Sequence, residues 1–247
     1  MHAHTLAPLD TAMDVVHDER SEVTAERDAF AALADRIAAC PAQSPPTAPR
    51  HDTGATVTGV GVSSVGSASD GDPSERLRRA YRETVMSVDH YDAVYGESLF
   101  ENAATELGAD LATALRGGVP FSPAFKSKLH ETVMDARAER KWFLERLRTE
   151  TASLTDARET LGDIVDTIPR NGSTPSQTVD ELWRRCDDVG RERQDVLRTQ
   201  FRSAPDGLYE HLYRDQSWTY PVLNVVAMLV ADLDGLRRID DSREFGR

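Results

Sequence analysis

Lysine, cysteine, aromatic residues and long apolar runs are scarce in this sequence, and each shortage narrows the class of protein. Only Lys126, Lys128 and Lys141 among the 29 basic residues are lysine, and the formal net charge is −13. Cys40 and Cys186 belong to no CxxC or Cys/His cluster, so we expect neither a zinc site nor a disulfide framework. Aromatic residues make up 6% of the chain, which suits a helical bundle better than a thick globular core.

No segment has the character of a membrane anchor. The longest apolar run, Val225 to Ala231, is far shorter than the roughly 20 residues that cross a bilayer. Residues 1–5 lack a basic region followed by an apolar stretch, so we expect no signal peptide. These absences predict a soluble cytoplasmic protein without a membrane partner.

The charge balance favours adaptation to high salt. At about 1 M salt the Debye length falls to about 3 Å, so a dense acidic surface no longer repels itself. In dilute buffer the same surface destabilises the compact state. The alternative is an ordinary acidic protein whose codon bias favours arginine over lysine.

A hydrophobic seam with alternating steps of three and four residues runs from 125 to 168. This spacing predicts one long helix packed lengthwise on others, about 65 Å long at about 1.5 Å per residue. Only Arg140 and Glu150 interrupt the seam, and no proline does. Its apolar members are Leu129, Val133, Ala136, Phe143, Leu147, Leu154, Ala157, Leu161, Ile164 and Ile168.

Further helices are predicted on both sides of this stretch. A heptad pattern predicts a helix over 8–39, and a capping sequence at Asp72 predicts another that begins at Pro73 and continues to about residue 92. One helix is expected from Leu99 to Leu115, with Ser122 capping the long helix that follows. Beyond a turn at 170–173 and a second capping sequence at 174–177, an antiparallel helix is expected, then a short helix near 208–213 and a last one from Pro221.

The predicted fold is therefore all-α: an elongated helical bundle with antiparallel coiled-coil pairing and one long disordered loop. Residues 1–40 form an N-terminal coiled-coil helix. Residues 41–73 are rich in proline, glycine, serine and threonine and are expected to be a flexible linker. Residues 74–247 form a helical bundle that packs with 1–40 as one domain.

Charged residues within the seams suggest a way to fix the register of the helices. The first helix carries Arg20 and Arg27 at seam positions, and Arg193 lies at one in a later helix. We expect Glu150 to meet one of these three arginines. The alternative is that the long side chains lie flat and reach out of the seam to water.

Catalytic and nucleotide-binding motifs are not found. The segment from Gly61 to Ser67 lacks the lysine and the helix start of a phosphate loop, and no GxSxG elbow occurs. The basic cluster Arg76, Arg78, Arg79 and Arg82 is largely cancelled by neighbouring acids, so we expect no nucleic-acid binding. We expect no catalytic residue, metal or cofactor.

One polar and aromatic cluster stands out between residues 81 and 102. Acid–base chemistry or a metal site is one interpretation, but a carboxylate-bridged metal site in a bundle needs Glu-x-x-His pairs, which are missing. A helix–helix corner with satisfied hydrogen bonds is the favoured interpretation. The candidate ligand or partner residues are Tyr81, Arg82, His90, Tyr91, Asp92, Tyr95, Glu97 and Asn102.

Several short motifs carry a resemblance that covers nearly the whole chain outside the linker. They are Tyr81–Met86, His90–Asp92, Tyr95–Ser98 with Glu101 and Asn102, Leu115–Gly118, and Trp218–Leu223. On these residues the chain resembles a family of haloarchaeal proteins with a domain of unknown function. The resemblance implies an archaeal high-salt source and transfers no activity or site.

Two functions are expected from these features. The first is a non-enzymatic interaction or scaffold protein that self-associates or binds a protein partner, since the long helix exceeds the other seam helices in length. The second is a regulatory module that senses a small ligand through the 81–102 cluster, which a concave pocket at His90, Tyr91 and Glu97 would favour.

Overall fold

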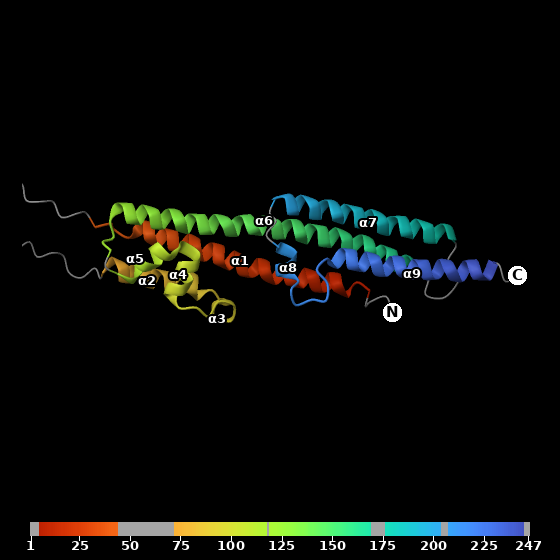
Figure 1. Cartoon of the computed structure of the whole chain (residues 1–247), viewed down its shortest axis with the longest axis horizontal. Helices are drawn as coiled ribbons and strands as arrows, with labels where there is room; N and C mark the ends of the chain where they lie inside the picture. Colours follow the sequence, from red (N-terminus) through yellow and green to blue (C-terminus); the bar gives the residue numbers. More distant parts are fainter. Residues whose placement is uncertain (1–4, 44–71, 118, 169–175, 204–206, 245–247) are drawn as a thin grey trace, which may run out of the picture. The chain divides into compact units, whose positions relative to one another are not determined.

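The computed structural model describes residues 5–43, 72–117, 119–168, 176–203 and 207–244, and over these ranges it contains helices and no strand (Figure 1). The predicted all-α class is thus confirmed. The elements, in order, are α1 (Ala7–Ala39), α2 (Pro73–Arg82), the 3-10 helix η2 (Val85–Ser87), α3 (Tyr91–Val94), α4 (Leu99–Leu107), α5 (Ala109–Arg116), α6 (Pro123–Thr167), α7 (Ser176–Ser203), α8 (Leu208–Leu212) and α9 (Pro221–Glu244).

The chain divides into two compact units, each with its own hydrophobic core. Unit 1 comprises residues 1–21 and 143–247, and unit 2 comprises residues 22–142. Helices α1 and α6 contribute one part to each unit. The division into a helix at 1–40, a linker at 41–73 and a bundle at 74–247 stays a prediction.

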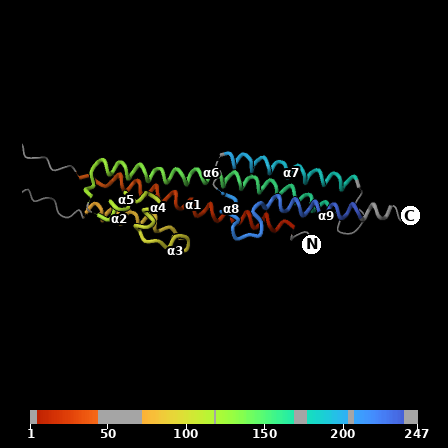
Figure 2. The backbone as a smooth tube through the Cα atoms, viewed as in Figure 1, coloured from red at the N-terminus to blue at the C-terminus, as the bar shows by residue number. Residues whose placement is uncertain are grey.

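Unit 1 is built from antiparallel helices. Arg146 and Glu150 of α6 bond Gln200 and Arg193 of α7 respectively, so the two helices run in opposite directions. Helix α9 lies beside α7, also antiparallel, as the tube in Figure 2 shows. The shared core contains Leu9 and Val16 of α1, Leu147, Leu154, Leu161 and Ile164 of α6, Leu182 and Cys186 of α7, and Val225, Leu229 and Leu233 of α9. The antiparallel arrangement of α6 and α7 therefore agrees with the expected hairpin, and coiled-coil packing stays a prediction.

Unit 2 packs four short helices against α1 and α6. Its core joins Phe30, Leu33 and Ile37 of α1, Leu77 and Tyr81 of α2, Leu99, Ala103 and Leu107 of α4, Leu111 and Leu115 of α5, and Leu129 and Val133 of α6, together with Phe121. The seam of α6 is thus buried by this chain in both units: Leu129, Val133 and Ala136 are buried in unit 2, and Leu147 to Ile168 in unit 1.

The predicted helix starts are confirmed where the structure describes them. The Asp72 carboxylate accepts a hydrogen bond from the Ser74 amide at 3.2 Å, and the Ser122 hydroxyl accepts one from the Phe125 amide at 3.2 Å. Each side chain satisfies an amide that has no partner within its helix. The predicted loop at 41–71, the turn at 170–173 and the first capping residues of α7 lie largely outside the described residues.

Two helices that were predicted to be continuous are interrupted in the structure. The helix from Pro73 to about residue 92 ends at Arg82, because Thr84 leaves helical geometry and its hydroxyl donates to the Ala80 carbonyl at 2.7 Å. Side-chain bonds of this kind compete with the backbone ladder. The helix from Leu99 to Leu115 is divided at Gly108, whose φ of 91° is open to glycine and strained for other residues.

Candidate functional site

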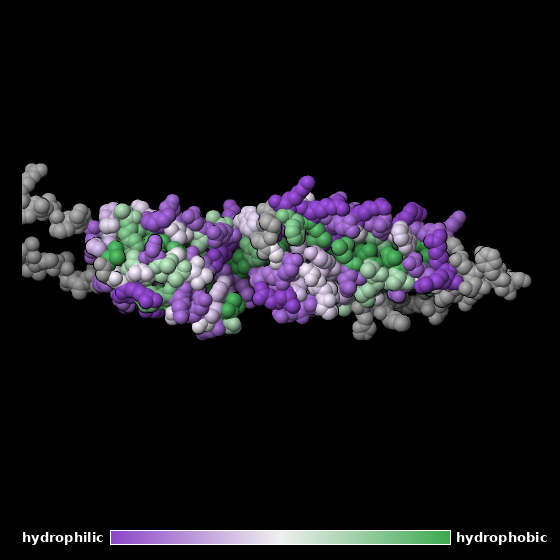
Figure 3. Space-filling view, in the orientation of Figure 1, coloured by the Kyte–Doolittle hydropathy of each residue, from purple (hydrophilic) through white to green (hydrophobic). Residues whose placement is uncertain are grey.

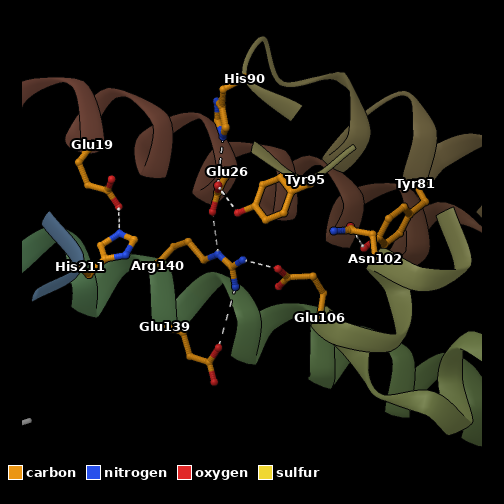
Figure 4. Close-up of polar contacts among 10 residues, drawn as sticks. All are labelled: Glu19, Glu26, Tyr81, His90, Tyr95, Asn102, Glu106, Glu139, Arg140 and His211. Carbon is orange, nitrogen blue, oxygen red and sulfur yellow. Dashed lines mark hydrogen bonds and ion pairs between the residues drawn. The ribbon is translucent and has the colours of Figure 1, made fainter. Parts of the chain in front are cut away.

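Glu26 is the centre of a polar network in unit 2, drawn in Figure 4. Its Oε1 accepts from the Tyr95 hydroxyl at 2.7 Å and lies 3.1 Å from His90 Nε2. Its Oε2 accepts from Arg140 Nε at 3.1 Å, and a terminal nitrogen of Arg140 donates to Glu106 Oε1 at 2.7 Å. We call Glu26, His90, Tyr95, Glu106 and Arg140 the Glu26 network.

The charged members of this network are shielded from water. The side chains of Glu26, Glu106 and Arg140 are 13%, 11% and 15% exposed. Burial alone would lower the pKa of Arg140, but Glu106 and Glu26 outweigh burial and raise it, so the guanidinium stays charged. The same guanidinium lies over the Phe30 ring, 4.8 Å from its centre. The two carboxylates and the aromatic face together stabilise the positive charge of Arg140 at this position.

A second chain of bonds lies next to this network. The Tyr81 hydroxyl donates to Asn102 Oδ1 at 2.8 Å, and Asn102 Nδ2 donates to Glu97 Oε2 at 3.2 Å. The Tyr91 hydroxyl donates to the Glu97 carbonyl at 3.1 Å. Burial raises the pKa of Tyr81, Tyr91 and Tyr95, so none of these phenols is a base near neutral pH.

Six of the eight residues predicted as a cluster meet in these bonds, and two do not. Tyr81, His90, Tyr91, Tyr95, Glu97 and Asn102 take part. Asp92 is exposed, and Arg82 is exposed with its nearest ion-pair partner, Glu75, at 3.7 Å. The side chains therefore hold α1, α4 and α6 around the short helix α3.

The space among these residues is small. A cavity of about 10 Å³ lies between Glu26, Tyr91, Tyr95, Asn102 and Arg140. A single water needs about that volume, and an organic ligand needs far more. The arrangement therefore favours a structural role, in which every carboxylate already has a donor.

The sequence did not assign Glu26, Glu106 and Arg140 to the cluster. Arg140 was identified as an interruption of the α6 seam, but the sequence did not indicate its partner. Glu26 lies three residues after the buried Val23 and four before the buried Phe30, so it occupies the inward face that Arg27 was expected to share. Arg27 instead pairs with Asp28 and is 33% exposed. Helical spacing could have identified Glu26 as an inward-facing residue, whereas no feature of the neighbouring sequence marks Glu106 as part of the network.

A second polar network is buried in unit 1. Arg193 donates two parallel bonds to Glu150, each 2.8 Å long, and the pair is 1% and 0% exposed. The Tyr213 hydroxyl donates to the same carboxylate at 2.9 Å, and Ser153 accepts from Arg193 at 2.9 Å. The expectation that Glu150 meets Arg20, Arg27 or Arg193 is confirmed, with Arg193 as the partner.

Neither network has the features of a metal or redox centre. Within the described residues, no three His, Cys, Asp or Glu side chains are grouped so as to hold a metal ion. Cys40 and Cys186 are both free and buried, and burial raises the pKa of the Cys186 thiol to about 11. Among the described helices, none has an apolar stretch long enough to span a membrane.

Comparison with known proteins gives a family and no activity. Residues 7–237 match the profile of a family described as a domain of unknown function, DUF7260. No curated protein and no solved structure matches the chain.

Proposed function

The chain belongs to the DUF7260 family, whose function is unknown, and we propose that it is a non-enzymatic interaction or scaffold protein that self-associates. The observation that carries the proposal is the exposure of two aromatic side chains on one face of α7 in unit 1. Trp183 and Phe201 of α7 are 37% and 51% exposed, and Met228 of α9 is 42% exposed. Trp183 and Phe201 lie on the same face of α7, and exposed apolar residues that share a face favour a contact with another protein.

Partly buried apolar residues lie on the same two helices. Leu197 of α7 and Val226 and Val230 of α9 pack against the core while remaining partly accessible. Figure 3 shows hydrophobic residues along this part of the chain, bordered by hydrophilic ones. An apolar centre with a polar rim is the usual anatomy of a protein interface.

The spacing of the two aromatic residues favours a second copy of this chain as the occupant. Trp183 and Phe201 are 18 residues apart (201 − 183), which is about five helical turns, so they share one face of α7. Two antiparallel copies of α7 would place each Trp183 against the other copy's Phe201. A two-fold interface repeats the same contact in this way.

The length of α6 does not support the proposal. Part of its seam was expected to need a partner, but the apolar seam residues are buried by this chain in both units, apart from Phe143, which is partly buried. The ligand-sensing alternative also has little support, because the space in the 81–102 cluster is about 10 Å³. The exposed aromatic residues therefore carry the proposal alone.

We also infer a haloarchaeal source and a high-salt cytoplasm as the setting. The support is the net charge of −13, the presence of only three lysines, and the motifs between Tyr81 and Leu223. A folded acidic protein in multimolar salt keeps its solubility while its apolar contacts strengthen.

Sedimentation velocity in multimolar potassium chloride tests self-association. We expect the wild-type protein to form dimers as its concentration rises, and the double variant Trp183→Gln/Phe201→Gln to remain monomeric with little change in melting temperature. Trp142→Gln is the control, because Trp142 is 47% exposed but lies in unit 2. A wild-type protein that stays monomeric at all concentrations, or a double variant that dimerises normally, would refute the proposal.

A further inference from the structure

Helix α7 carries opposite charges in its two halves. Residues 176–189 contain four acidic residues and two arginines, whereas residues 190–203 contain two acidic residues and four arginines. Within the described residues, each half also forms one ion pair with another helix of unit 1: Asp180 with Arg237 of α9, and Arg193 with Glu150 of α6. With these pairs counted, the first half keeps a formal charge of −1 (−4 + 2 + 1) and the second a charge of +1 (+4 − 2 − 1).

This division of charge favours one relative orientation of two α7 helices. The chain has a net charge of −13, so two copies repel each other as wholes, and locally complementary charges are needed to favour a contact. Antiparallel copies place the acidic half of each α7 beside the basic half of the other, whereas parallel copies place like charges together. The charge of α7 therefore fits a second copy of the same helix in antiparallel orientation.

Trp183 and Phe201 lie on one face of α7, which we call the aromatic face. Helix α9 covers one flank of this face. Gly190 lies on that flank, about 20° from the aromatic face, and a Cβ added to Gly190 would lie 3.7 Å from the Val226 side chain of α9. Gln194 lies on the other flank and is exposed. The flank opposite α9 is therefore the one at which a second copy can contact the aromatic face.

Asp187 and Arg198 lie on the flank opposite α9. Asp187 follows the first aromatic residue by four positions and Arg198 precedes the second by three, so they lie about 40° and about 60° from the aromatic face. Their side chains are 34% and 70% exposed. Within one copy, Asp187 pairs with Arg191 and Arg198 pairs with Asp195 at 2.7 Å. Exposed pairs one turn apart in a helix contribute little, so both side chains can exchange partners.

We propose that Asp187 of each copy pairs with Arg198 of the other, and that these two ion pairs hold the α7 helices antiparallel. The inference rests on the self-association proposed above. When each Trp183 lies against the other copy's Phe201, Asp187 and Arg198 lie within one residue, or about 1.5 Å, of the same level. A two-fold axis keeps the same flank of both helices on one side of the interface, so the contact occurs twice. Charged pairs beside an apolar contact set the partner and orientation of packed helices in the same way.

A charge exchange tests the proposal by sedimentation velocity of the full chain. The buffer contains the lowest potassium chloride concentration at which the wild-type protein dimerises, because ion pairs are screened least there. Asp187→Arg and Arg198→Asp should each weaken dimerisation about tenfold, since each changes two attractive contacts per dimer into repulsive ones. The double variant Asp187→Arg/Arg198→Asp should regain the wild-type affinity, because its charges are exchanged and still complementary.

Asp188→Arg is the matched control. The Asp188 carboxylate pairs with the same Arg191, at 3.3 Å, but it lies about 140° from the aromatic face. We therefore expect the Asp188→Arg variant to dimerise with the wild-type affinity. If it weakens dimerisation as much as Asp187→Arg does, the contact of Asp187 with a second copy is refuted.

An equimolar mixture of the two single variants distinguishes the orientations. Antiparallel copies should restore the wild-type affinity in the mixture, whereas parallel copies would bind more tightly than the wild-type protein, because each residue would then meet its own counterpart. Tighter binding, or a double variant as weak as the single ones, would overturn the ion pairs and leave self-association standing. A wild-type protein that is monomeric at every salt concentration would refute both proposals.

Discussion

Glu150 and Arg193 are the most completely buried charged residues in the described part of the chain. Taking two charges out of water is costly, and only a close pair with further hydrogen bonds offsets that cost. Here Tyr213 and Ser153 supply the further bonds. Although burial would lower the pKa of Arg193, the Glu150 carboxylate raises it, so the guanidinium remains charged. The pair joins α6 to α7 at one register, because a slip would leave both charges alone.

Glu150→Gln is expected to lower the free energy of unfolding by about 3–5 kcal/mol, since it leaves the Arg193 charge buried without its carboxylate. Denaturant unfolding at constant high salt measures this change. The control is Glu145→Gln, whose carboxylate is 61% exposed and pairs with Arg148 at 3.4 Å. An exposed pair contributes less than about 1 kcal/mol.

A double variant distinguishes loss of the pair from a general packing defect. Glu150→Leu combined with Arg193→Met removes both charges and should regain most of the lost stability, because apolar replacements of a buried ion pair are often neutral. Equal losses in the Glu150→Gln and Glu145→Gln variants would argue against the assigned role of the pair.

His211 gives unit 1 a dependence on pH. Its Nε2 lies 3.1 Å from Glu19 Oε1, and this hydrogen bond raises the pKa of the imidazole above its ordinary value. Burial and the neighbouring Arg214 act in the opposite direction without reversing the shift. A histidine whose pKa is higher in the folded state than in the unfolded state contributes its full stabilisation at pH values below the unfolded-state pKa of about 6.5. This contribution is lost as the pH rises through the folded-state pKa.

We expect the stability difference between the wild-type protein and His211→Gln to shrink as the pH rises from about 6 to 8. The change should be small, because the His211 side chain is 47% exposed. Glu19→Gln should flatten the same curve, since it removes the carboxylate that raises the pKa. If the stability difference between the wild-type protein and His211→Gln stays constant across this pH range, the assignment of His211 is contradicted.

The sequence indicated which residues were unusual without showing their contacts. Arg140 and Glu150 were visible because a charge interrupts an apolar seam, and helical periodicity is a local property. The partner of Glu150 was narrowed to three arginines, because seam positions face other helices. Glu106 could not be assigned, because its meeting with Arg140 depends on how α4 packs against α6.

At the scale of the elements, most helices could be predicted from the local spacing of apolar residues, but the interruptions of these helices could not. The 45-residue helix α6 was predicted over 125–168 because its apolar residues repeat at helical spacing and no proline interrupts them. The division between α4 and α5 was missed because a glycine within an apolar helical pattern is usually tolerated. Here Gly108 serves as C-cap of one helix and N-cap of the next.

Gly108→Ala is expected to destabilise the fold by about 1–3 kcal/mol, because its backbone (φ 91°, ψ 152°) lies in a region that is almost exclusive to glycine. Apart from Gly108 and its two chain neighbours, no described residue has an atom within 4 Å of an added Cβ, so the cost arises from the backbone. Thermal and denaturant unfolding measure the effect.

The same substitution in the interior of α9 is a control for which we expect the opposite change in stability. Gly235 also has open space around an added Cβ, but it lies within a helix. Gly235→Ala should stabilise the protein by about 0.4–1 kcal/mol through the unfolded state. Destabilisation by both variants would show that the backbone at Gly108 is not the cause.

At the scale of the whole molecule, the chain combines a large net negative charge with two separate cores. The net charge of −13 makes self-repulsion a global property that salt relieves. The Debye length falls from about 10 Å at 0.1 M salt to about 3 Å at 1 M, so most of the screening is complete within that range.

We therefore expect the melting temperature to rise steeply with potassium chloride up to about 1 M, and then to level off. Differential scanning calorimetry over a salt series measures this curve. A rise that continues in proportion to salt would indicate stronger apolar burial instead of screening. A melting temperature that is independent of salt would contradict the proposed adaptation to high salt.

The sequence by itself determined the all-α class, the position of α1 and α6, the capping residues Asp72 and Ser122, and the charges within the seams. These features depend on neighbours a few positions away, whose spacing along a helix is fixed. Tertiary structure alone decided that Glu26 and Glu106 enclose Arg140, and that Arg193 is the arginine that meets Glu150. Such contacts join residues far apart in the chain, and they exist only once helices have packed.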